Sequence, residues 1–189
     1  PRKEDLLKPE FRFRRGAEWL VLPALARQLS TSDTERIAVL DLLTKGVTET
    51  SRLLAAEGAD NDIATATALY FTQLWGVARQ RAVPEAGADA LHAQIVGALA
   101  GPEVAAMSDA DKQRYWEYCL GLPIFVLGMR EVATEPAAQA DLRTIAAAAF
   151  EVLLGVRPEL VDIGNEGLKL AAGVEEALAA PAMSPAAPA

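Results

Sequence analysis

The sequence predicts an all-α protein, a compact bundle of six or seven antiparallel helices in a single domain. Of the 189 residues, 51% are hydrophobic but only 6% are aromatic, and alanine, the best helix former, is abundant. β-Branched residues are scattered and rarely alternate with polar ones, which argues against strands. Apolar residues instead recur every third or fourth position, in stretches that end at glycine or proline.

The chain divides into three parts. Residues 1–15 contain Pro9 and the run FRFRR, which together predict an extended basic arm. Residues 16–175 form the helical domain, and residues 176–189, rich in Ala and Pro, are expected to be disordered. No apolar run approaches the roughly 20 residues that span a bilayer, so no transmembrane segment is predicted.

The first two predicted helices follow the arm directly. Residues 17–29 are apolar enough for a helix that is bent or broken at Pro23. Residues 32–58 begin with Ser32 and Glu35, which form a capping-box pattern, and they end at a glycine. The inward positions predicted for this second helix are Ile37, Leu40, Leu43, Val47 and Leu54.

The third and fourth helices are predicted over residues 60–84 and 85–100. Asp60 or Asn61 is expected to cap the third helix, because a short side-chain oxygen accepts bonds from unpaired backbone N–H groups. Its predicted inward face consists of Ile63, Ala66, Tyr70, Leu74 and Val77. The fourth helix carries Leu91, Ile95 and Leu99 at every fourth position.

Three more helices complete the predicted bundle. The fifth runs from a cap at Ser108 to about Thr134, with a bend expected at Pro123. The sixth runs from Pro136 to Gly155, and the seventh is a weaker helix over residues 158–173. The inward positions of the sixth helix are predicted to be Leu142, Ile145, Ala149 and Val152.

The charge distribution argues against a nucleic-acid partner. The formal net charge is −8, and because residues 1–15 hold six basic and three acidic residues, the rest of the chain carries −11. An acidic body repels phosphate, whose affinity for proteins comes largely from basic side chains.

Several kinds of chemistry are excluded by what the chain lacks. His92 is the only histidine and Cys119 the only cysteine, so a zinc site with several His and Cys ligands cannot be assembled. Cys119 lies in an aromatic, apolar stretch and is expected to be a buried structural thiol. Calcium-loop and phosphate-loop patterns also fail, so neither a metal nor a cofactor is predicted.

The start of the fifth helix raises the main question about a site. Gln113 and Glu117 are four residues apart, so a helix places their side chains side by side. One hypothesis is a polar tie between two helix starts, with partners among Asn61, Asp62, Thr65 and Tyr70. The other is a ligand pocket with aromatic walls and polar anchors. Its predicted lining residues are Asp62, Tyr70, Trp75, Gln113, Trp116 and Glu117.

Two stretches carry a resemblance to a known family. DNDIATATALYFTQLW, residues 60–75, and SDADKQRYWEY, residues 108–118, resemble an uncharacterised bacterial domain-of-unknown-function family of all-helical, often exported proteins. The resemblance covers residues 59–128 and leaves the basic arm and the Ala/Pro tail outside. It implies a helical fold and a periplasmic or secreted location, and it implies no activity.

These observations lead to three functional hypotheses. The first is a non-enzymatic interaction or scaffold domain of the bacterial cell envelope, whose possible partners are proteins. The second is a binding protein for an apolar small molecule, with a pocket between the third and fifth helices. The third is an acid–base enzyme that uses Asp62 and Glu117. The oligomeric state is left open. The arm is expected either to be a solvated or self-docked terminus or to dock a partner or an anionic surface. Its residues for such docking are Phe11, Arg12, Phe13, Arg14 and Arg15.

Overall fold

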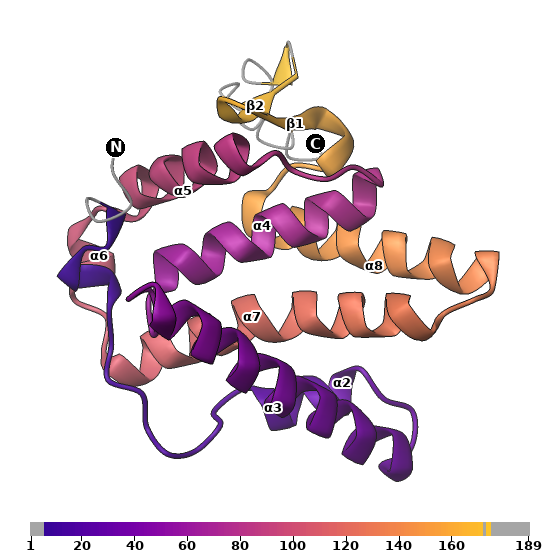
Figure 1. Cartoon of the computed structure of the whole chain (residues 1–189). Coiled ribbons are helices and arrows are strands. Elements are labelled where there is room, and N and C mark those ends of the chain that lie inside the picture. Colours follow the sequence, from indigo (N-terminus) through magenta and orange to yellow (C-terminus); the bar gives the residue numbers. More distant parts are fainter. Residues whose placement is uncertain (1–5, 172, 175–189) are drawn as a thin grey trace, which may run out of the picture.

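The predicted all-α fold is confirmed. The computed structural model of the chain describes residues 6–171 and 173–174, and within them seven α-helices precede one small antiparallel sheet (Figure 1). The predicted tail at residues 176–189 lies outside the described residues. The elements are η1 (Pro9–Phe11), α2 (Leu22–Gln28), α3 (Asp33–Ala56), α4 (Ile63–Arg79), α5 (Glu85–Leu99), α6 (Pro102–Ala105), α7 (Asp109–Val132), α8 (Pro136–Leu154), η2 (Pro158–Leu160), β1 (Val161–Gly164) and β2 (Gly167–Leu170).

Helix α4 lies at the centre of the fold and packs against α5, α7 and α8. Helices α7 and α8 run side by side in opposite directions, and α3 packs on α7 together with the short α2 (Figure 1). The inward face predicted for α4 is confirmed, since all five of its residues are buried. Burial of so apolar a face on three neighbours is the main source of stability for such a helix.

The N-termini of the long helices are capped by side chains. Ser32 Oγ accepts from the Glu35 N–H, and Ser108 Oγ accepts from the Asp111 N–H, as the sequence predicts for both. The cap of α4 is Asp62 rather than Asp60 or Asn61, because Asn61 has a positive φ of 51° and turns the chain just before the helix.

The first predicted helix is shorter than expected. It begins at Leu22, and Pro23 lies in its first turn, where a proline needs no N–H and its fixed φ suits the helix. Residues 17–21 are not helical. Pro123, by contrast, lies inside a helix that is assigned continuously from Asp109 to Val132.

Three residues predicted to face inward are on the surface. Ile37 of α3 is 68% exposed, and Ile145 and Val152 of α8 are 37% and 70% exposed. The predicted inward positions Leu43, Val47, Leu142 and Ala149 are buried, as expected. The other buried residues, Val39, Ala146 and Phe150, lie one or two positions from the three exposed ones, since a helix has room for several faces with similar apolar spacing.

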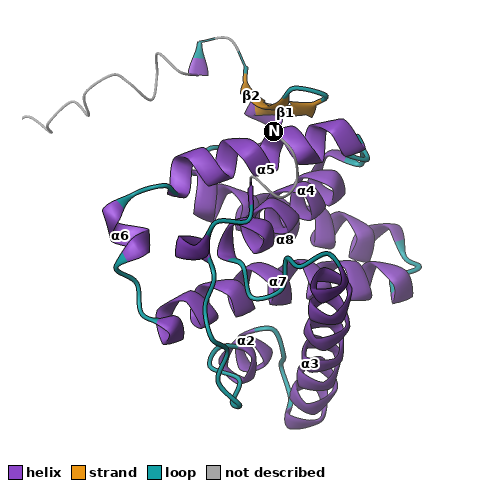
Figure 2. Ribbon diagram, turned by 60° about the vertical axis from the view of Figure 1, so that its left-hand side comes forward, coloured by secondary structure: helices purple, strands orange, loops and turns teal. Residues whose placement is uncertain are grey.

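The predicted seventh helix is wrong, because residues 161–170 form a β-hairpin. Val161 pairs with Leu170 and Gly164 with Gly167, which leaves Asn165 and Glu166 as a two-residue turn. Gly167 has a φ of +86°, a conformation that glycine adopts at little cost. The hairpin packs on α5 at the edge of the bundle (Figure 2).

Candidate functional site

The six residues predicted to line a pocket are all inside the protein. Their exposed fractions are 0% except for Gln113, at 2%. The Tyr70 hydroxyl donates to the Ala149 carbonyl of α8 at 2.6 Å, and Trp75 Nε1 donates to the Val161 carbonyl of β1 at 3.1 Å. The polar atoms of these two aromatic residues therefore hold α4 against two different elements. Gln113 also borders a hollow of about 380 Å³ next to residues 14–20.

Gln113 and Glu117 form the side-by-side pair that their spacing predicts. Gln113 Nε2 donates to Glu117 Oε1 at 2.8 Å. Gln113 also accepts from the Gly16 N–H and donates to the Glu18 carbonyl, each at 2.8 Å. The partners expected in the third helix are wrong, because both side chains bind backbone groups that precede α2.

The carboxylate of Glu117 caps α2 from outside that helix. Its Oε2 accepts from the backbone N–H of Leu20 at 2.9 Å and of Val21 at 2.7 Å. A carboxylate is favoured at this end of a helix, where N–H groups lack partners inside the helix and the dipole is positive. Glu117 is thus a fully buried anion held by backbone donors.

The N-terminal segment, residues 6–21, lies along the helices down to α2 (Figures 1 and 2). The Phe11 side chain is fully buried and Phe13 is 8% exposed. Arg12 forms a strand-like bridge with Asp62, and the Phe13 N–H donates to the Asn61 carbonyl at 3.2 Å. Both phenylalanines therefore belong to the core of this chain.

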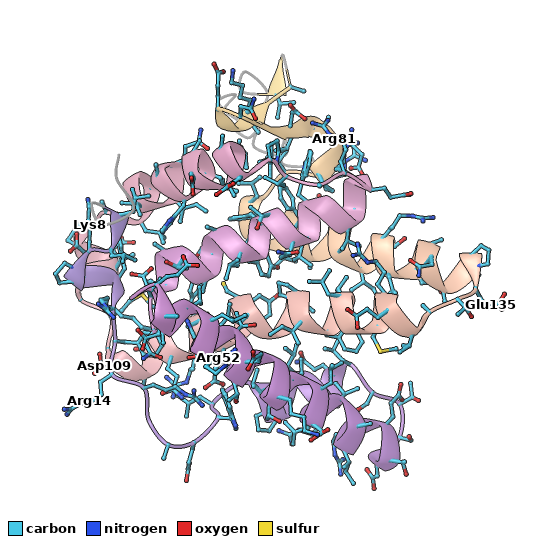
Figure 3. The ribbon with its side chains drawn as sticks, in the orientation of Figure 1. Lys8, Arg14, Arg52, Arg81, Asp109 and Glu135 are labelled. Carbon is cyan, nitrogen blue, oxygen red and sulfur yellow. The ribbon has the colours of Figure 1, made fainter. Side chains whose placement is uncertain are left out.

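The arginines of the segment lie differently from its phenylalanines. The Arg12 guanidinium pairs with Asp60 at 3.3 Å, and Arg15 stacks over the Trp19 ring at 4.0 Å. Arg14 is exposed and lies at the same corner as Asp109 (Figure 3). Docking of a partner on this segment stays a prediction, and the exposed side chains of Arg12 and Arg14 are accessible for it.

Asp62, the other carboxylate of the acid–base hypothesis, has its own role as a helix cap. Its Oδ1 accepts from the Thr65 N–H at 2.8 Å, while Oδ2 is buried without a hydrogen-bond partner. Burial raises the pKa of Asp62, although the bonds from Thr65 and the charge of His92 act in the opposite direction. Asp62 and Glu117 thus accept hydrogen bonds from different backbone segments, at the start of α4 and just before α2.

Replacing Asp62 with asparagine should raise the free energy of unfolding at pH 7. Asparagine keeps the cap, and it removes a charge whose ionisation the folded state disfavours. The pKa of Asp62 is raised in the folded state, so the gain in the free energy of unfolding is complete at pH values above that raised pKa. It should shrink as the pH falls towards about 4, the ordinary pKa of aspartate. Urea unfolding between these pH values measures the difference. Asp141→Asn, an exposed change in α8, should leave the pH profile unchanged, and a constant Asp62→Asn effect would contradict the account.

A groove on the open side of α4 was not predicted from the sequence. Its volume is about 880 Å³, and it lies between the C-terminal half of α4, the loop before α5, and the turn region of α7 and α8. Its polar lining residues are Thr72, Gln73, Gln80, Arg81, Arg130, Gln139 and Arg143, and its larger apolar ones are Leu69, Val77, Val83 and Leu127. We call this feature the α4 groove.

The three arginines of the α4 groove come from three different elements. Arg81, at the end of α4 near the hairpin (Figure 3), pairs with Asp162 at 3.0 Å and stacks on Trp75 at 5.1 Å. Arg130 and Arg143 form no ion pair with a carboxylate among the described residues. With the Gln80 amide oxygen turned towards Arg143, that oxygen accepts from Nε at 3.2 Å and from Nη1 at 3.3 Å. Two guanidinium charges therefore border the groove without a carboxylate partner in the part of the chain that the structure describes.

The lining of the α4 groove contains binding groups and no proton-transfer group. The residues that form it in the described chain include no carboxylate, histidine, cysteine, tyrosine or lysine. The Thr72 hydroxyl donates to the Ala68 carbonyl of its own helix at 2.9 Å. Arginine stays protonated at any physiological pH and presents a planar fork of donors that matches carboxylates and phosphates.

An apolar cavity lies on the other side of α4. Its volume is about 410 Å³, and Phe71, Leu91, Ile95 and Leu154 are among its walls. Burial raises the pKa of the Cys119 thiol to about 12, so this thiol is a poor nucleophile.

The described residues contain no group of three or more His, Cys, Asp and Glu side chains that is placed to hold a metal ion. None of the helices in this part of the chain combines the length and the apolar composition that a transmembrane span needs.

Comparison with known proteins identifies the family but gives no relative of known role. Neither the curated proteins nor the solved structures contain a match to this chain. The family match extends well beyond the expected residues 59–128 and includes the basic arm, which was expected to lie outside it. Since the match spans residues 2–171, the chain belongs to a family of unknown function (DUF6683).

Proposed function

We propose that this protein is a non-enzymatic interaction domain whose binding surface for a partner protein is the α4 groove. The observation that carries the proposal is the lining of the groove. It combines glutamines and apolar side chains with Arg130 and Arg143, neither of which forms an ion pair with another residue that the structure describes. Grooves of several hundred Å³ that combine apolar walls with a few polar anchors are typical of binding sites.

The overall charge supports a specific rather than a general role for these arginines. In a chain with a net charge of −8, a local group of guanidinium ions gives an attractive region for an anionic partner on a surface whose average charge is negative. The same net charge disfavours nucleic acid, which needs a broad basic surface.

Site-specific cross-linking in the native source tests this proposal. A photoreactive benzoylphenylalanine at Gln73, an exposed residue of the groove, should form an adduct of defined mass. The adduct should be lost in the Arg130→Gln/Arg143→Gln variant, because the groove then has no uncompensated charge. Arg79→Gln/Arg157→Gln is the matched control, since both residues are exposed and lie outside the groove lining. This double substitution removes the same amount of charge. The proposal is refuted if no adduct forms or if the adduct is equally strong in both double variants. It is also refuted if a probe at the exposed Ile37 forms the same adduct equally well.

A second candidate function is the binding of an apolar small molecule. The cavity of about 410 Å³ between α4 and α5, reached also by Tyr115 of α7, favours it. The neutral dye Nile red should become fluorescent with the protein, and Ala98→Trp, at the exposed rim of the cavity, should remove the signal. Ala100→Trp, also exposed but outside the lining, is the control, and equal signals from both variants would exclude this function.

A further inference from the structure

We propose that the α4 groove recognises an acidic peptide segment of the partner in an extended conformation. This inference rests on the proposed function and adds the chemical nature of the recognised element. It is carried by three features: the open backbone of the loop between α4 and α5, the length of the groove floor, and the positions of the arginines on opposite walls.

The loop between α4 and α5 offers backbone groups to an extended chain. Ala82 and Val83 line the groove, and neither their N–H nor their C=O groups bond to another described residue. The loop leads into Pro84, whose φ of −62° and ψ of 149° are extended, and a residue that precedes proline also favours an extended backbone. A peptide can donate to these carbonyls and accept from these N–H groups, as in strand addition. A small carboxylate ion cannot donate, so it would leave the carbonyls unpaired.

The floor of the groove matches the length of a short peptide. Its residues on α4 run from Leu69 to Val77, which at 1.5 Å per residue corresponds to about 12 Å. An extended peptide rises about 3.3 Å per residue, so about four residues cover this length. One carboxylate or phosphate ion would occupy only a small part of it.

The arginines lie on both sides of that floor. Arg81 belongs to the loop that leads to α5, whereas Arg130 and Arg143 belong to α7 and α8 on the other side. Successive side chains of an extended peptide point in opposite directions. Acidic residues on one side of the peptide would therefore face Arg130 and Arg143, where each carboxylate can accept two parallel N–H bonds, whereas Arg81 already pairs with Asp162. The recognised pattern is a short run of Asp or Glu residues.

Isothermal titration with synthetic peptides tests the inference. The probe is an acetylated and amidated hexapeptide of alternating Asp and Glu, and the Asn/Gln hexapeptide of equal length is its uncharged control. We expect the acidic peptide to bind and the amide peptide to bind at least tenfold more weakly, with the affinity falling as salt increases. Arg130→Gln/Arg143→Gln should weaken binding at least tenfold, whereas Arg79→Gln/Arg157→Gln should change it less than twofold.

Two further ligands separate a peptide from a simple anion. The same acidic hexapeptide with every second amide methylated keeps its charges but loses N–H donors, and it should bind at least fivefold more weakly. Succinate and inorganic phosphate should not compete with the peptide at millimolar concentration. Equal binding of the methylated peptide, effective competition by succinate or phosphate, or no binding of the acidic hexapeptide would overturn the inference.

The failure of this inference can be distinguished from failure of the proposed function. If the acidic peptide does not bind while the arginine-dependent cross-link at Gln73 still forms, the groove binds a partner of other chemistry. If the cross-link itself is absent or independent of Arg130 and Arg143, both proposals fail.

Discussion

Replacing Glu117 with alanine is expected to lower the free energy of unfolding by about 3 kcal/mol or more. The carboxylate is fully buried and accepts bonds from Leu20, Val21 and Gln113. Without it, donors in the interior lose their acceptor, and a hydrogen bond to a charged group contributes about 1.5–3 kcal/mol. The start of α2 would also lose the anion at its N-terminus.

Urea unfolding followed by circular dichroism measures this effect, and amide hydrogen exchange localises it. Exchange should accelerate first at Leu20 and Val21, whose N–H groups bind the carboxylate. Glu131→Ala, an exposed change near the end of the same helix, should cost less than about 0.5 kcal/mol. Glu117→Gln should lie between the two, because an amide has one acceptor oxygen instead of two. A Glu117→Ala protein within about 0.5 kcal/mol of the parent would contradict the assigned role of this side chain.

Replacing Gly87 with alanine is expected to cost about 2–3 kcal/mol and to release the hairpin from α5. A Cβ at Gly87 would overlap the carbonyl oxygen of Gly164, which is backbone and cannot turn away as a side chain can. The contact between α5 and β1 would have to open. The bond from Trp75 Nε1 to the Val161 carbonyl would weaken with it, so the fluorescence of Trp75 reports the change.

Gly97 provides the matched control on the same helix. It is exposed and a Cβ there would meet no atom within 4 Å, so Gly97→Ala should stabilise the protein by about 0.5–1 kcal/mol. The two glycine-to-alanine changes should therefore have opposite signs in a thermal unfolding experiment. Equal effects would mean that the hairpin does not pack tightly on α5.

The helices could largely be predicted because their signals are local. Ser32 and Ser108 each cap a helix through an N–H three residues later, and the α4 face follows from the spacing of its apolar residues. The hairpin was missed because Val161 and Ile163 alternate with polar neighbours over only four residues, too few to compete with a helical reading. Gly164 and Gly167 pair with each other at the ends of its turn.

The candidate site could be predicted only in part, since most of its contacts join distant parts of the chain. The i to i+4 pair of Gln113 and Glu117 follows from helix geometry, but their backbone partners lie 95–97 residues away. Arg81, Arg130 and Arg143 are isolated in the sequence, and only the packing of α4, α7 and α8 brings them to one groove. No local pattern marks residues of this kind.

The position of the N-terminal segment also has a consequence for the order of events during synthesis on the ribosome. Phe11 is translated about 100 residues before the part of α7 that carries Gln113 and Glu117. At roughly 5–20 residues per second, translation of that interval takes roughly 5–20 s, and for this time the edge-to-face contact of Phe13 with Trp116 cannot form. Residues 6–21 thus reach their full set of native contacts only after α7 has been synthesised.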